Sequence, residues 1–265
     1  MDFIRQFQGV WTALITPFQD GEVDEKSLRT LVRRQLDQGV DGLVVNGTTG
    51  ESPTLRLEEV EHIFQIVRSE VSGQMPLMLG VGDNCTWRSV EQAQRFERLR
   101  PDAFLLATPA YNKPPQKGLI EHCKLVASSV DLPVFLYNVP GRSAISIATQ
   151  SLVELAEVPQ IVGVKEASGD LNWMKTDIKQ LPQDFVLLSG DDPTWLEFVA
   201  HGGHGVISVA SHLLGEPFKK MMLSVTPSKT QSLMAPYLEL IETLYVESNP
   251  IPVKRSLAEL GWIAS

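Results

Sequence analysis

The chain has 265 residues, of which 43% are hydrophobic and 21% charged, and its formal net charge is -9. This is an ordinary globular composition, and an acidic chain without a stripe of Lys and Arg argues against nucleic-acid binding. No apolar run approaches the ~20 residues that span a bilayer, the N-terminus does not resemble a signal peptide, and two cysteines, Cys85 and Cys123, make no disulfide framework. We therefore expect a cytoplasmic protein that binds neither membranes nor nucleic acid.

Short apolar runs alternate with segments of helical periodicity along the chain. Most of the runs are apolar throughout, which is typical of parallel strands covered on both faces. The predicted strands are Val10–Thr16, Gly42–Asn46, Leu77–Val81, Ala103–Thr108, Val134–Asn138, Ile161–Lys165, Val186–Ser189 and Gly205–Val209. The predicted helices are one between an N-cap at Asp24 and Gly39, then Glu58–Val71, Trp87–Leu99, Gln116–Ser129, Ile147–Glu157, Leu171–Gln180, Pro193–Ala200 and Pro217–Val225.

This alternation implies parallel strands joined by helical crossovers. Eight such units close most simply into a (β/α)₈ TIM barrel, and an open doubly wound sheet is the alternative. After Thr226 the strand pattern stops, and two helices are predicted at Leu233–Val246 and Val253–Trp262, separated by a proline-rich break. We expect a catalytic barrel over residues 1–225 and a short C-terminal helical segment over residues 226–265.

Lys165 ends the apolar run Ile161–Val164, which predicts a buried strand. Burial disfavours a charged ammonium, so the neutral amine becomes more accessible than on a surface lysine. Such an amine attacks carbonyl groups to form a Schiff base. Alternatively, Lys165 extends to solvent or pairs with Glu166.

Polar residues follow the predicted strands at the end of the barrel where active sites lie. An imine between Lys165 and a 2-oxo acid is an electron sink, and Tyr137 can move protons if Thr48 or Thr49 and a second phenol hold it. Arg142 offers a bidentate grip on a carboxylate. These polar segments are Asn46–Ser52, Thr108–Asn112, Tyr137–Ser143, Lys165 and Ser189–Asp192.

Each of these residues also has a purely structural interpretation. In the segment Gly47–Glu51, Gly47 and Gly50 could let backbone N–H groups approach a substrate carboxylate. The same segment is also typical of a tight turn without a function. Tyr137 could be a core tyrosine, and Arg142 a surface residue of a Pro-Gly turn.

The remaining polar residues are predicted to be structural. Asp191 and Asp192 could serve acid–base or metal chemistry, but Asp192 followed by Pro193 favours a helix N-cap. His201 and His204 do not have the spacing of a helical ligand pair, so no metal or cofactor is predicted.

Taken together, the motifs resemble the dihydrodipicolinate synthase / N-acetylneuraminate lyase family of Schiff-base barrel enzymes, from about Gly9 to Trp262. Arg142 favours the synthases, whose substrates are pyruvate and L-aspartate 4-semialdehyde, over the sialic-acid lyases, which place other residues there. The motifs are GTTGES (47–52), TPAYNKP (108–114), YNVPGR (137–142), GVKEASGDL (163–171), LLSGDD (187–192), GGHGVISV (202–209) and NPIPVK (249–254).

The resemblance implies a role for each matching residue. Lys165 is the Schiff-base lysine, Tyr137 the proton donor and acceptor, and Thr48 the relay between two tyrosines. Tyr111 matches a tyrosine that reaches the active site of a neighbouring subunit, which implies a homodimer or homotetramer. The residues that match substrate contacts are Thr49, Arg142, Gly190 and Ile207.

The chain departs from the family at several positions. Ala110 replaces the first of two adjacent tyrosines, and the chain stops at Ser265, where relatives usually continue through another helix. Around the pocket that binds lysine in feedback-inhibited members, Ser52 and Asn84 fit, but other positions do not, so we predict weak or absent inhibition by lysine. The positions that do not fit are Leu57, Val60, Arg88 and Ala110.

Two further functions remain open from the sequence. One is a related pyruvate-dependent aldolase or dehydratase that acts on a sugar acid. The other is a truncated, non-catalytic paralogue that serves as a binding protein.

Overall fold

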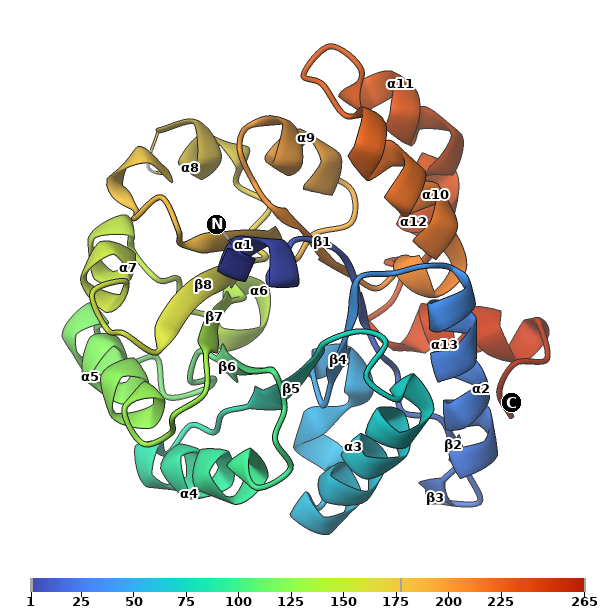
Figure 1. Ribbon diagram of the computed structural model, residues 1–265, viewed down its shortest axis with the longest axis horizontal. Helices are drawn as coiled ribbons and strands as arrows, with labels where there is room; N and C mark the ends of the chain where they lie inside the picture. The colour runs from blue at the N-terminus through green and yellow to red at the C-terminus, as the bar shows by residue number, and fades with distance from the viewer. Residues whose placement is uncertain (1, 177, 265) are drawn as a thin grey trace.

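The computed structural model describes residues 2–176 and 178–264, and a parallel β-barrel stands at its centre (Figure 1). Within these residues eight strands close in the order β1-β10-β9-β8-β7-β6-β5-β4, so the TIM barrel is confirmed and the open sheet is wrong. The strands are β1 (Gly9–Ala13), β4 (Gly42–Val45), β5 (Leu77–Val81), β6 (Ala103–Ala107), β7 (Val134–Asn138), β8 (Ile161–Glu166), β9 (Val186–Ser189) and β10 (Gly205–Ser208).

Helices cover the outside of the barrel between successive strands (Figure 1). The first begins as predicted, because the Asp24 side chain accepts a hydrogen bond from the N–H of Ser27 at 3.0 Å. Gly39 closes it with a φ of 69°. The helices are α2 (Glu25–Asp37), α3 (Leu57–Val71), α4 (Thr86–Glu97), α5 (Gln116–Ala127), α6 (Pro140–Ser143), α7 (Thr149–Leu155), α8 (Leu171–Thr176), α9 (Trp195–Ala200) and α10 (Ser211–Ser224), with 3₁₀ turns η1 (Thr48–Gly50), η2 (Ser52–Thr54) and η3 (Ile178–Gln180).

Some element boundaries differ from the prediction for local reasons. β1 ends at Ala13, because the N–H of Ile15 donates to the His212 imidazole at 3.2 Å and leaves the ladder. α10 begins at Ser211 rather than Pro217, since a kink at Leu214 accommodates the proline inside the helix. Short elements that were not predicted include α6, α1 (Asp2–Phe7) and the hairpin of β2 (Phe18–Gln19) and β3 (Glu22–Val23).

The C-terminal part is helical, as predicted, but more broken. The helix expected at Leu233–Val246 is divided by Pro236, which cannot donate a backbone hydrogen bond. Its pieces and the last helix are α11 (Thr230–Met234), η4 (Ala235–Tyr237), α12 (Leu238–Thr243) and α13 (Ile251–Glu259).

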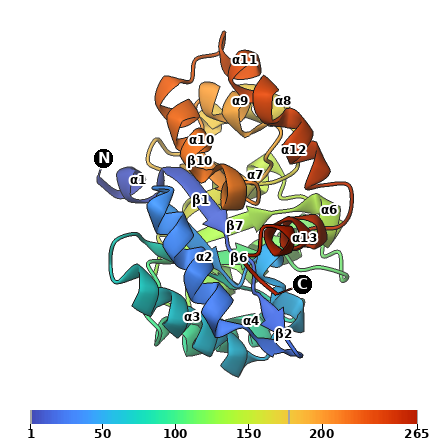
Figure 2. The ribbon, with the colours of Figure 1, turned by 90° about the vertical axis from the view of Figure 1, so that its right-hand side faces the viewer.

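The barrel interior has one apolar end and one polar end. At the amino end of the strands Phe7 stacks on Trp11, with ring centres 5.9 Å apart, and packs against Phe135 at 5.1 Å. The opposite end, here called the mouth, is where α6 and α13 lie (Figure 2). Aromatic side chains therefore fill the amino end of the barrel interior. In the described parts of the chain, no helix is both long and apolar enough to span a membrane.

Candidate active site

Lys165 and Tyr137 lie side by side at the mouth of the barrel. They stand opposite one another in the pairing of β7 with β8, and both are buried, with 6% and 7% of their surfaces exposed. Lys165 Nζ lies 4.2 Å from the centre of the Tyr137 ring. A nucleophilic amine beside a phenol combines carbonyl attack with proton transfer.

Glu166 is not the partner of Lys165. Its carboxylate accepts hydrogen bonds from Asn138 Nδ2 and from the N–H of Ser168, each at 2.7 Å. Burial raises the pKa of the Glu166 carboxyl. Among the described residues no ion pair joins Glu166 to Lys165, and the low exposure of Lys165 excludes a side chain extended into solvent. The structural interpretation of Lys165 is therefore wrong on both counts.

Gly190 provides the space that the Lys165 side chain occupies. A Cβ atom at this position would lie 2.7 Å from Lys165 Cε and 2.7 Å from Ala167 Cβ. These separations are well below the ~3.5–4.0 Å of a normal carbon–carbon contact. Gly190 thus determines where the amine lies, which is a more specific role than the substrate contact implied by the sequence.

Thr48 and Thr49 lie in η1, the turn that follows β4. Thr49 is 3% exposed, and its hydroxyl oxygen accepts a hydrogen bond from Asn249 Nδ2 at 2.8 Å. Because an acceptor lone pair is used in this way, the hydroxyl proton of Thr49 stays available for a carboxylate. Thr48 is half-buried in the same turn. The segment is thus both a tight turn and a source of hydroxyl groups at the mouth.

Arg142 lies in α6, exposed at the same end of the barrel. Its Nη2 donates to the backbone oxygen of Asn249 at 2.8 Å. A guanidinium has further N–H donors, so the remaining ones can face a ligand carboxylate. Asn249 therefore contacts both Thr49 and Arg142. The sequence assigned no role to Asn249 itself, although it begins the family motif NPIPVK (249–254) in the proline-rich break between two predicted helices.

Ile207 and Tyr111 occupy very different environments. Ile207 lies in β10 opposite Trp11 and is 1% exposed inside the barrel. Tyr111 is 89% exposed with a φ of 71°, and the neighbouring Asn112 Nδ2 donates to the backbone oxygen of Asn84 at 2.6 Å. The Tyr111 phenol thus projects outward rather than lining the mouth of its own subunit.

Asp192 is not the helix cap that the sequence predicted. α9 begins later, after Thr194, and the N–H of Thr194 donates to Asp191 at 3.2 Å. Asp192 instead lies almost wholly inside the protein, where its Oδ2 accepts from the N–H groups of Val209 at 3.0 Å and Ala210 at 2.8 Å. Burial raises the pKa of the Asp192 carboxyl.

The residues predicted to surround an effector lie in different local environments. Val60 is buried in the outer core, and Leu57 packs beside it at the start of α3. Arg88 Nη2 donates to Asp83 at 2.8 Å and to Asn84 Oδ1 at 2.9 Å, so the Asn84 side chain is already engaged. The other positions are Ser52, half-buried in η2, and Ala110, exposed before Tyr111.

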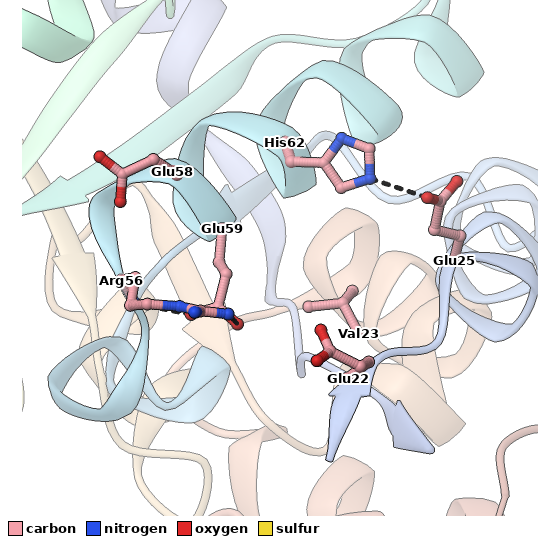
Figure 3. A pocket seen from close by; sticks show the side chains of 7 residues that line it. All are labelled: Glu22, Val23, Glu25, Arg56, Glu58, Glu59 and His62. Carbon is pink, nitrogen blue, oxygen red and sulfur yellow. Dashed lines mark hydrogen bonds and ion pairs between the residues drawn. The ribbon is translucent and has the colours of Figure 1, made fainter. Parts of the chain in front are cut away.

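A separate hollow of about 510 Å³ lies between the β2–β3 hairpin, α2 and α3 (Figure 3). In it His62 Nε2 lies 2.8 Å from Glu25 Oε1, but none of its lining residues is among those at the mouth. Its side chains are Glu22, Val23, Glu25, Arg56, Glu58, Glu59 and His62. Within residues 2–176 and 178–264, no group of three or more His, Cys, Asp and Glu side chains is arranged to hold a metal ion.

A closed barrel with a buried lysine–tyrosine pair at its mouth defines the class of this protein: it is a TIM-barrel enzyme. Residues 6–265 match the dihydrodipicolinate synthetase family, and the chain belongs to this family. It is accordingly a lyase.

Known relatives support this assignment over nearly the whole chain. The 4-hydroxy-tetrahydrodipicolinate synthase of Bdellovibrio bacteriovorus is 46% identical over 99% of this chain and 90% of its own length. The synthase of Bacillus subtilis is 43% identical over 96% of this chain and 90% of its own. Among solved structures, the lysine-bound enzyme from Cyanidioschyzon merolae superposes with a TM-score of 0.92 at 39% identity, covering 97% of this chain and 89% of that one.

Proposed function

We propose that this enzyme condenses pyruvate with L-aspartate 4-semialdehyde, the reaction of a 4-hydroxy-tetrahydrodipicolinate synthase in lysine and diaminopimelate biosynthesis. The observation that carries the proposal is the buried Lys165 amine, held beside Tyr137 and given its space by Gly190. The relatives supply the identity of the reaction, since the synthases of Bdellovibrio bacteriovorus and Bacillus subtilis match nearly the full length of the chain.

In the first half of the reaction, Lys165 attacks the ketone of pyruvate and water is lost, which forms a protonated imine. The imine withdraws electrons from the adjacent methyl group, and loss of a proton from that group gives an enamine. Tyr137 donates and accepts these protons because its phenol lies against the amine. Thr49 binds the pyruvate carboxylate with the hydroxyl proton that its contact with Asn249 leaves free, and Thr48 relays protons between Tyr137 and a second phenol.

In the second half, the enamine carbon attacks the aldehyde of the semialdehyde and a carbon–carbon bond forms. Arg142 binds the carboxylate of this second substrate, because it is an exposed cation at the mouth whose guanidinium keeps donors free for a carboxylate. The amino group of the product then displaces Lys165 from the imine by transimination. The product cyclises, and the free Lys165 amine is restored without a cofactor.

The second phenol of the relay is proposed to come from a neighbouring subunit. A side chain that enters another subunit is exposed when its own subunit is considered alone. Tyr111 is 89% exposed, and Trp87 is likewise 67% exposed. We infer a homodimer or homotetramer in which Tyr111 of each chain completes the site of the other. The free thiols of Cys85 and Cys123 support a cytoplasmic setting.

Lysine is proposed to inhibit this enzyme weakly or not at all. Arg88 places a cation beside Asn84, where an ammonium ligand would be repelled. Val60 lies in the core and offers no polar group. Isothermal titration should detect no tight binding of lysine, and tight binding with inhibition would contradict this proposal.

A coupled assay with pyruvate and L-aspartate 4-semialdehyde tests the proposed reaction. We expect turnover by the wild-type chain and none above background by Lys165→Ala. No turnover of this pair, combined with cleavage of a keto-sugar acid, would contradict the proposal and indicate a sugar-acid aldolase instead.

A further inference from the structure

Residues 244–254, here called the closing segment, comprise the connection between α12 and α13 and the first turn of α13, at the mouth of the barrel. Near the end of the segment, Lys254 Nζ donates to the backbone oxygen of Thr16 at 2.9 Å and to Glu51 Oε1 at 2.6 Å. In its middle, Asn249 contacts Thr49 and Arg142. The position of the closing segment therefore decides where two groups assigned to the substrates lie.

The first part of the closing segment is held by a buried carboxylate. The Tyr245 hydroxyl donates to Asp192 Oδ2 at 2.8 Å, on the same oxygen that accepts from the N–H groups of Val209 and Ala210. Asp192 is 1% exposed, whereas the Tyr245 residue as a whole is 40% exposed, so the tyrosine reaches inward from the surface with its hydroxyl. A buried hydrogen-bonding group is costly to leave without its partner, so this contact ties the tyrosine firmly to the interior.

This contact joins parts of the mouth that belong to different strands. Asp192 follows Gly190 after β9, and Val209 follows Ile207 at the end of β10. Burial raises the pKa of the Tyr245 hydroxyl, and the charge of Asp192 raises it further, with a contribution from Tyr137. The hydroxyl therefore stays protonated and can donate, and it lies within electrostatic reach of the catalytic tyrosine.

We propose that Tyr245 and Asp192 form a latch that fixes the closing segment, so that Asn249 holds Arg142 in position for the second substrate. Tyr245 and Asp192 are positioning residues, because they act on the ligand through Asn249 and Arg142. The proposal rests on the proposed function, since it assumes that Arg142 binds the aldehyde substrate. It gives a role to Tyr245, for which the sequence indicated none, and to Asp192, for which the sequence indicated helix capping.

The test removes only the latch hydroxyl, with Tyr245→Phe, which keeps the aromatic ring. We expect KM for L-aspartate 4-semialdehyde to rise about tenfold, the effect of leaving one buried hydrogen-bonding group without its partner. Imine formation at saturating pyruvate, measured by borohydride trapping, should stay within about twofold, because among the described residues no hydrogen bond joins Tyr245 or Asp192 to Lys165 or Tyr137. Tyr237→Phe is the matched control, since it removes a hydroxyl from η4 in the same helical part of the chain.

A double-mutant cycle distinguishes positioning from general stability. If the latch acts through Arg142, Tyr245→Phe should have no further effect on the aldehyde kcat/KM in an Arg142→Ala background. Additive losses, or an equal loss of pyruvate trapping, would show a merely structural role and overturn the proposal. Wild-type kinetics in Tyr245→Phe would overturn it as well.

Two further measurements complete the test. The unfolding midpoint of each variant is recorded, and Asn249→Ala provides a second variant that keeps the latch but removes the contact with Thr49. Asn249→Ala should raise KM for pyruvate, and an unchanged KM for pyruvate would contradict the role given to Asn249. Absence of turnover by the wild-type chain would instead contradict the proposed function.

Discussion

Replacing Gly190 by alanine adds one methyl group against the side chain of Lys165. The new Cβ would lie 2.7 Å from Lys165 Cε and 3.1 Å from Lys165 Cγ. A normal contact needs ~3.5–4.0 Å, so the lysine stem must move by about 1 Å. A misplacement of about 1 Å at a reacting group can cost about 10²-fold in rate. Overpacking should also lower the free energy of unfolding, by about 1–3 kcal/mol.

Steady-state kinetics with both substrates, together with the rate of borohydride trapping by pyruvate, measure this effect. We expect kcat and the trapping rate of Gly190→Ala to fall together, because the displaced atom is the nucleophile itself. Gly118→Ala in α5 is the control, since its Cβ would meet neighbours at an ordinary 3.6 Å. A Gly190→Ala variant that traps pyruvate at the wild-type rate would refute the role assigned to Gly190.

Three further predictions follow from the site and the core. Mixing Lys165→Ala chains with Tyr111→Phe chains should restore about one quarter of wild-type activity. Half of the dimers are then mixed, and each mixed dimer has one intact site out of two. No recovery would mean that Tyr111 acts within its own chain. Arg142→Lys should raise KM for the semialdehyde about tenfold and leave KM for pyruvate unchanged, since a lysine loses the bidentate grip; equal changes in both constants would argue against the assignment. Burial lowers the pKa of the His212 imidazole to about 4, so the unfolded chain binds a proton more readily than the folded chain. The free energy of unfolding should therefore fall by up to about 3 kcal/mol as pH drops from about 6.5 to 4. Denaturant unfolding should show this loss in the wild type but not in His212→Gln, and parallel losses in both would contradict the prediction.

The barrel and the catalytic strand ends could be predicted because their signals are local. Alternating apolar runs and helical periodicity report the crossovers, and the carboxyl ends of parallel strands meet at one end of the barrel. This reasoning correctly brought Thr49, Tyr137 and Lys165 to the mouth as buried polar residues. The motif resemblance added what the periodicity could not, namely which of these residues perform chemistry.

The contacts that the sequence did not reveal join residues far apart in the chain. Asn249 lies 200 positions from Thr49, and no local pattern reports a hydrogen bond at that separation. Asp192 was misjudged for a related reason: an Asp-Pro pair is typical of a helix start, but backbone N–H groups from the next strand competed for its carboxylate. Long-range satisfaction of buried polar groups is a property of the folded chain rather than of any short segment.

The central claim is that the Lys165 amine forms an imine with pyruvate. Incubation with pyruvate and borohydride, followed by peptide mass spectrometry, tests it directly, with Lys165→Ala as the control. We predict a reduced pyruvyl adduct on the peptide that contains Lys165 and loss of activity in proportion to labelling. Failure to label this peptide in the wild-type chain, or equal labelling of Lys165→Ala, would contradict it.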